Sequence, residues 1–479
     1  MQIQSHLYNQ RNLGNGEAAS LLHPVVLVAL LVAIALILWR PRKFAIVSLI
    51  LGVFLIPRGQ VIVVEGAHFY IRLIIILVGF ILVIRSRFAI AGGLNSIDWL
   101  FIVWALYRFV AEIVTNWPNG IMEEIAFCLQ AYCGYFLLRY LIRNEEDIMR
   151  AVKALAITAA ILGVCMMYEQ ISHTNPFGAI LGGAPISPDV RNGTVRAQAA
   201  FGHEILAGCF GATLVPLYFW LWKVKERAFA VVGFVGSTLM VLASYSSTPV
   251  LAYVASILGL FLWPIRRYMR PVRWGLVAVV AGLAMVMKAP VWYIIGHINV
   301  IGGSGGWDRA FLLDTCARHF KDWWLIGTNQ NGSWGYDMWD LSDQFVAEAE
   351  TGGLVTLLCF VAIISLSYRR LGLMMRRVTP RKQWLFWSLG CVMLAHIFAF
   401  MGAAYWDQTE VWWFAFLAMI CAATIPLSSP AVAQTAAAPA ETKFPQFAKV
   451  ASAWATPQAV PAPLPAPDTD TQRHWMLEQ

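Results

Sequence analysis

Long apolar runs recur along most of this chain and limit what it can fold into. Thirteen such runs follow one another between Pro24 and Ser428, and a helix of about 20 apolar residues is what the hydrocarbon core of a bilayer requires. Only 13% of the residues are charged and 59% are hydrophobic, against about 25% and about 45–50% in soluble domains. The sequence therefore predicts an all-α polytopic membrane protein with about 12–13 transmembrane helices. The predicted spans are 24–39, 44–57, 69–84, 97–115, 122–140, 152–170, 205–222, 229–244, 248–265, 274–292, 354–368, 384–402 and 411–428.

The basic residues predict how these spans are oriented. Of the 35 Lys and Arg residues, 22 follow odd-numbered spans. Cytoplasmic loops carry an excess of Lys and Arg, so we expect the N-terminus and the even-numbered loops outside and the C-terminus in the cytoplasm. The formal net charge of +8 then reflects membrane topology, and we expect no nucleic-acid partner.

Three regions follow from this pattern. Residues 1–23 are a polar N-terminal segment, and the first span after them is expected to stay uncleaved. Residues 24–428 form the membrane domain, with long outward loops at about 171–204 and 293–353; the second is a large cap between the tenth and eleventh spans. Residues 429–479 are rich in Ala and Pro and are predicted to be a disordered cytoplasmic tail.

Familiar cofactor signatures are absent from the sequence. It has no Walker A loop, no HExxH motif and no Cys–His cluster with metal spacing, so no metal or cofactor is expected. One ionisable pair, Arg108 and Glu112, lies inside a span, four residues apart on one helix face. This pair is either a self-paired buried couple or part of a polar wall lining a cavity.

The outward loops hold most of the remaining polar residues. Arg191 and Arg196 precede His203 in the first loop; the two Arg side chains either clamp a phosphate-bearing headgroup or are interfacial anchors. In the cap, Trp307 suits an interfacial position. His319 beside Arg318 is either a catalytic candidate or a surface and packing residue.

Four segments, in order, resemble the O-antigen ligase and O-antigen polymerase superfamily. "RAQAAFGHEILAG" resembles its Arg-x-x-Gly-x-Phe-x-x-Pro-Asn signature, with Ala199 and Glu204 in place of the Gly and Pro. "ASYSSTPVLAYVASILGLFL" resembles its serine-rich entry into a span. "GGSGGWDRAFLLDTCARHFKDWWLIGTN" resembles its loop opening, with Arg309 at the loop Arg. "SDQFVAEAETGGLVTLLCFV" resembles the end of its cap, with Leu341 where the pattern has His. With a tryptophan before the loop Arg, as in "GWDR", the sequence resembles exopolysaccharide-type polymerases more than lipopolysaccharide ligases.

The resemblance implies a GT-C-like fold and a metal-independent glycosyltransferase in the bacterial inner membrane, with a periplasmic N-terminus. Such an enzyme moves a glycan from an undecaprenyl-diphosphate carrier to a glycan acceptor, among membrane lipids and beside polysaccharide export or chain-length proteins. Without a metal, Arg side chains must offset the charge of the diphosphate leaving group; Arg196, Arg191 and Arg309 are the candidates. Candidate substrate-binding residues are Arg191, Trp307, Asp343, Gln344 and His319.

The proton of the acceptor hydroxyl needs a general base. With the family His missing, Glu348 is the first candidate, followed by His203, Asp343 and His319. Two other functions remain open, namely a transporter of polysaccharide or lipid-linked sugar and a non-catalytic assembly partner. Transport requires polar residues through the middle of the membrane, whereas here they gather in the outward loops.

Overall fold

The computed structural model describes residues 20–64, 67–117, 121–297, 306–335, 338 and 341–425. Most of the polar N-terminal segment, the Ala/Pro-rich tail and, within the cap, residues 298–305, 336–337 and 339–340 lie outside the described residues. Within the described part the chain is mostly helical, and a helix forms at every predicted span. The helices at these spans are α2 (Pro24–Trp39), α3 (Arg42–Leu55), α4 (Ile71–Arg85), α5 (Ser96–Asn116), α6 (Ile121–Leu141), α7 (Glu145–Ser172), α9 (Glu204–Lys223), α10 (Arg227–Ala243), α11 (Ser247–Phe261), α12 (Met269–Val286), α15 (Gln344–Arg377), α16 (Pro380–Phe400) and α17 (Gln408–Ala423).

Length and composition make several of these helices suitable membrane spans. In the described part of the chain, six helices are long and apolar enough to cross a bilayer, and α2, α10, α11 and α17 are shorter apolar helices. The chain is thus a membrane-embedded, largely helical protein.

Two short antiparallel hairpins depart from the all-helical expectation. Strands β1 (Val61–Val64) and β2 (Ala67–Tyr70) pair before α4, and β3 (Asp189–Arg191) pairs with β4 (Thr194–Arg196) before α9. The second hairpin turns through Asn192 and Gly193, which have φ of 52° and 76°. Asn-Gly is the dipeptide that a tight hairpin turn favours, so this hairpin was readable in the sequence.

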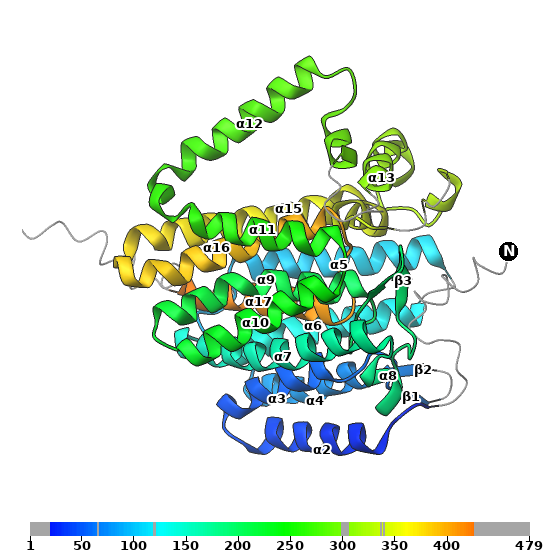
Figure 1. Ribbon diagram of the computed structural model, residues 1–479, viewed down its shortest axis with the longest axis vertical. Helices are drawn as coiled ribbons and strands as arrows, with labels where there is room; N and C mark the ends of the chain where they lie inside the picture. The colour runs from blue at the N-terminus through cyan, green and yellow to red at the C-terminus, as the bar shows by residue number, and fades with distance from the viewer. Residues whose placement is uncertain are drawn as a thin grey trace, which may run out of the picture. The chain divides into compact units, whose positions relative to one another are not determined.

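Close contact between small residues holds the helices together. The hydrophobic effect contributes little to this packing, because the surrounding lipid is itself apolar. Gly163 of α7 faces Gly236 of α10 so closely that a Cβ at Gly163 would lie 2.4 Å from the Gly236 carbonyl oxygen. α9 and α17 lie deepest, and nearly every residue of α17 is buried. By contrast, α12 buries none of its residues and runs apart from the bundle (Figure 1).

The segments predicted to face outward gather at one end of the bundle. Figure 1 shows both hairpins, α8 (Pro176–Ile180) and the cap helix α13 (Gly306–Arg318) at that end. The Gly59 N–H donates to the Gly183 carbonyl at 2.7 Å. Asn329 of the cap donates to the Thr115 carbonyl at the end of α5 at 2.8 Å. We call this the hairpin end.

A glycine kink brings the cap onto α15 and corrects one predicted boundary. The loop expected to run to 353 instead ends at Asp343, and α15 begins at Gln344; the helix is broken at Gly352 and at Gly353 (φ 66°, ψ −159°). At this kink the Leu354 N–H donates to the Trp324 carbonyl at 2.9 Å. The candidate base Glu348 therefore lies on a helix, one turn before a break that the cap covers.

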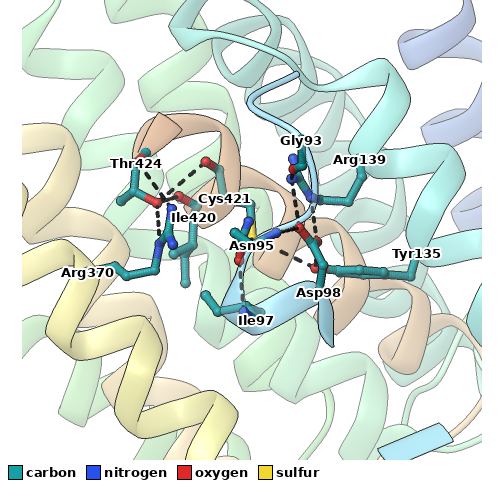
Figure 2. A network of polar contacts seen from close by, with 10 residues as sticks. All are labelled: Gly93, Asn95, Ile97, Asp98, Tyr135, Arg139, Arg370, Ile420, Cys421 and Thr424. Atoms are coloured by element: carbon teal, nitrogen blue, oxygen red, sulfur yellow. Dashed lines mark hydrogen bonds and ion pairs between the residues drawn. The ribbon is translucent and has the colours of Figure 1, made fainter. Parts of the chain in front are cut away.

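At the opposite end, a buried polar network joins α5, α6 and α17 (Figure 2). The Asp98 carboxylate accepts from Arg139 at 2.8 and 3.0 Å and from the Tyr135 hydroxyl at 2.6 Å. It also accepts from the Asn95 N–H at 2.8 Å, which closes a capping box at the start of α5. Because Asp98 and Arg139 are buried and bonded to each other, this network holds α5 and α6 together.

Asp98→Asn should lower the free energy of unfolding by about 3–5 kcal/mol, because it leaves the Arg139 charge buried without a counter-ion. Glu146→Gln is the matched control, since its side chain is 76% exposed in a surface pair with Arg150 and such pairs contribute about 0–1 kcal/mol. Denaturation in mixed micelles measures both variants. An equal loss of unfolding free energy in the two variants would contradict a structural role for the Asp98 network.

Gly353→Ala should detach the cap from α15. The left-handed backbone at Gly353 disfavours a side chain, and a Cβ there would lie 2.6 Å from the Leu325 carbonyl oxygen. The strain alone is worth about 1–3 kcal/mol, so limited proteolysis should cut the 320–335 segment faster in this variant. Gly372→Ala is the control, because Gly372 lies on the same helix with nothing near its Cβ position. In this variant the protease should cut the 320–335 segment at the wild-type rate.

Candidate active site

A cavity opens between α5, α15, α16 and α17 near the hairpin end. The space in it that can hold the centre of a water molecule is about 10 Å³, which is room for about one water. A bound sugar would therefore require side chains to move. Six of the ten lining residues are aromatic, and the four others are polar and converge from α5, α15 and α17. The lining residues are Trp104, Arg108, Gln344, Glu348, Phe360, Phe400, Tyr405, Glu410, Trp413 and Phe414.

Glu348 is held in this cavity as a hydrogen-bond acceptor. Its side chain is fully buried. Oε2 accepts from the Trp104 indole N–H at 2.6 Å, and Oε1 accepts from the Gln344 amide at 2.8 Å. Two donors from different helices fix the orientation of the carboxylate, as a catalytic acid or base requires.

Arg108 provides the positive charge next to Glu348. Its guanidinium lies 3.7 Å from the centre of the Phe127 ring, and nearby carboxylates stabilise its charge; these are Glu124, Glu348, Glu112 and Glu410. Arg108 lines the cavity, as the polar-wall interpretation expects, and it also interacts with Glu112, as the paired interpretation expects.

The segment from Tyr405 to Glu410 connects the cavity to its surroundings. The Tyr405 N–H donates to Gln344, Asp407 forms an ion pair with Arg72 of α4, and Glu410 accepts from Gln130 of α6 at 2.6 Å. Asp407 adopts φ 62° and ψ −131°, a conformation that costs a non-glycine residue of order 1–3 kcal/mol. Strain of this kind accumulates where a site demands a fixed geometry.

The structure brings four predicted residues near the cavity. Glu348 and Gln344 line it, and Asp343 caps α15 by accepting from the N–H groups of Phe345 at 2.8 Å and Val346 at 3.1 Å. Arg309 of α13 lies close enough to the Asp343 carboxylate to stabilise its charge. Asp343 thus has a structural role as a helix cap beside the cavity.

Arg196 and His203 form a neighbouring group at the same end. Arg196 is buried and bridges Asp189 at 3.0 Å and Glu204 at 2.5 Å. His203 caps α9 by accepting from the Ile205 N–H at 3.2 Å, and its side chain is 40% exposed. This group meets the loop before α17, because a Cβ on Gly202 would touch the Trp406 ring at 2.6 Å.

Three other predicted residues lie on the surface. Arg191 is exposed on β3. Trp307 is 53% exposed and packs edge-on against His297, with ring centres 5.0 Å apart. His319 stacks on Trp334 at 5.0 Å and contacts Asp322 at 2.9 Å, which matches its surface and packing interpretation.

Sequence reasoning missed Arg72, Trp104, Asp407 and Glu410. Two signals could have indicated them. Arg72 is a lone charge inside the apolar run "FYIRLIII", and "YWDQTE" places two acids at the start of the last span; ionisable residues within spans are functional candidates by default.

Comparisons with known proteins leave the family open. No family model matches the chain, and no curated protein matches it significantly. Among the described residues, no group of three or more His, Cys, Asp or Glu side chains is placed to hold a metal ion.

Asp343 makes stability depend on pH. Burial raises its pKa to about 6 from the usual 3.8, while the N–H groups of Val346 and Phe345 and the Arg309 charge act in the opposite direction. The native state therefore binds this proton more tightly than the unfolded chain, and this contribution to stability is lost as pH rises from about 4 through about 6. Asp343→Asn, which still caps the helix, should gain stability relative to wild type over that range. Thermal unfolding at pH 4 to 7 checks this, and a constant difference would contradict it.

Proposed function

We propose that the protein is a membrane glycosyltransferase that polymerises or ligates glycan repeat units from an undecaprenyl-diphosphate carrier at the outer face of the bacterial inner membrane. The observation that carries this proposal is the joint placement of the Glu348 carboxylate and the Arg108 guanidinium in an aromatic-lined cavity at the hairpin end. Topology, with the hairpin end outside and the basic loops in the cytoplasm, is part of the proposal.

The proposed reaction assigns roles to these groups. The acceptor hydroxyl attacks the anomeric carbon of the donor sugar and passes its proton to the Glu348 carboxylate. The bond from that carbon to the carrier diphosphate breaks, and the diphosphate leaves with the electron pair. Arg108 is placed to offset its negative charge within the cavity, and Arg196 and Arg309 are further candidates at the same end.

The lining of the cavity suits a carbohydrate. Aromatic rings offer flat apolar surfaces to sugar faces, and the carboxylates and amides offer partners to hydroxyl groups; binding sites commonly combine an apolar wall with a few placed polar groups. Gln344 and Glu410 are the polar candidates for sugar hydroxyls. Trp307 and His319 are not part of the cavity lining.

Backbone geometry supports the resemblance on which the proposal also rests. The signature has Gly at the place of Ala199, and Ala199 adopts a φ of 51°, a left-handed conformation that Gly adopts without strain. Position 199 therefore adopts the backbone conformation for which the signature carries Gly.

Deletion of the gene, followed by complementation, tests the proposal. Glu348→Gln should lower polysaccharide formation by about 10²–10⁴-fold, the usual contribution of a positioned base, and Arg108→Gln should lower it too. Carrier-linked single repeats should accumulate if the enzyme is a polymerase, and full-length carrier-linked chains if it is a ligase. Membrane levels of each variant are compared by immunoblot.

Glu146→Gln and Arg318→Gln are the matched controls, since both side chains are exposed, at 76% and 75%. Both should restore wild-type polysaccharide. Normal chain length and amount with Glu348→Gln and Arg108→Gln would refute a catalytic site in this cavity. Carrier-linked glycan held on the cytoplasmic face of the deletion strain would point to a transporter.

A further inference from the structure

His396 of α16 lies behind the cavity wall, where an apolar side chain would pack at a lower cost in free energy. It is fully buried, and its ring centre lies 5.0 Å from that of Phe416, 5.2 Å from that of Trp413 and 5.7 Å from that of Phe400. Nε2 has no hydrogen-bond partner among the described residues. Burying a polar group that is only partly bonded costs free energy, so a packing role does not explain the imidazole.

The hydrogen bond that His396 does make leads into the cavity. Its Nδ1 lies 3.0 Å from the Tyr405 hydroxyl, and Tyr405 belongs to the loop between α16 and α17. The Tyr405 ring is part of the cavity lining, as are the Phe400 and Trp413 rings that surround His396. His396 therefore fixes one side of the cavity from behind.

Tyr405 continues the connection through its backbone. Its N–H donates to Gln344 Oε1 at 2.5 Å, and the Gln344 amide nitrogen donates to Glu348 Oε1 at 2.8 Å. An amide has one acceptor end and one donor end. As long as the Tyr405 N–H occupies the oxygen, the NH₂ group must face Glu348; a reversed amide would set its oxygen against the carboxylate.

We propose that His396 is a positioning residue for Glu348, acting through Tyr405 and Gln344. The imidazole anchors the Tyr405 ring, the ring holds the loop, and the Tyr405 N–H sets the direction of the Gln344 amide. The contacts run from α16 to the loop before α17 and from that loop to α15. These three parts of the chain must therefore be correctly placed before Glu348 is oriented. The catalytic part of this inference rests on the proposed function, whereas the positional part does not.

Hydrogen exchange of the Tyr405 amide tests the positional part on the whole protein in nanodiscs, without any substrate. His396→Phe keeps a ring in the aromatic pocket but removes the hydrogen bond, and Tyr405→Phe removes the same bond from the other side. Each should speed exchange of that amide about tenfold, the effect of losing one hydrogen bond. His396→Asn, whose amide can take the place of Nδ1, should keep exchange near the wild-type rate.

Turnover of the lipid-linked oligosaccharide that accumulates in the deletion strain tests the catalytic part. His396→Phe and Tyr405→Phe should each lower kcat about 10- to 100-fold, as a misplaced catalytic group does, with KM within about twofold. The double variant should be no slower than either single one, because both break one connection. His396→Asn should recover most of kcat.

Tyr253→Phe is the matched control, because Tyr253 bonds to Thr238 at 2.9 Å and is not part of the cavity lining. It should change neither readout. Unchanged Tyr405 exchange in His396→Phe would overturn the inference, as would additive losses of kcat in the double variant. If wild-type protein turns over no glycan while His396→Phe still speeds Tyr405 exchange, the proposed function fails and the positioning role stands.

Discussion

A charge buried in a membrane protein must be matched by a partner, and this constraint governs both ends of the bundle. At the end with the basic loops, Asp98 and Arg139 are bonded to each other and to their neighbours, so the network stabilises the helices. At the hairpin end, the carboxylates of Glu348 and Glu410 and the guanidinium of Arg108 line a cavity instead. Buried pairs of opposite charge thus stabilise helix packing at one end and form a candidate reactive centre at the other.

The helices could be predicted because each apolar run is a local property of the sequence. The start of α15 could also have been predicted. "SDQFVAEA" carries an Asp at the N-cap, a recognised start signal, and the helix does begin after Asp343. The prediction instead placed the span start beyond the two glycines. Glu348 was selected by resemblance alone, and its two donors were not foreseen.

The candidate site was harder to predict because its contacts join distant parts of the chain. Trp104 and Glu348 are 244 residues apart, and Gln130 and Glu410 are 280 apart. No spacing rule links such positions, since helix packing decides which side chains meet. His396 shows the same limit, because a His in an apolar run indicates nothing until the Tyr405 loop is placed beside it. Arg309 and Arg196 were chosen from local motifs, and the structure places both at the hairpin end.

The position of α17 has a consequence for how the protein is made. This helix is almost wholly buried and packs against α3, α6, α7, α9 and α15. The loop before it provides Tyr405, and its first turn provides Glu410. Chains emerge from the ribosome from the N-terminus, so every earlier helix can be in the membrane while the cavity still lacks one wall. The cavity is therefore completed only when α17 packs against these earlier helices.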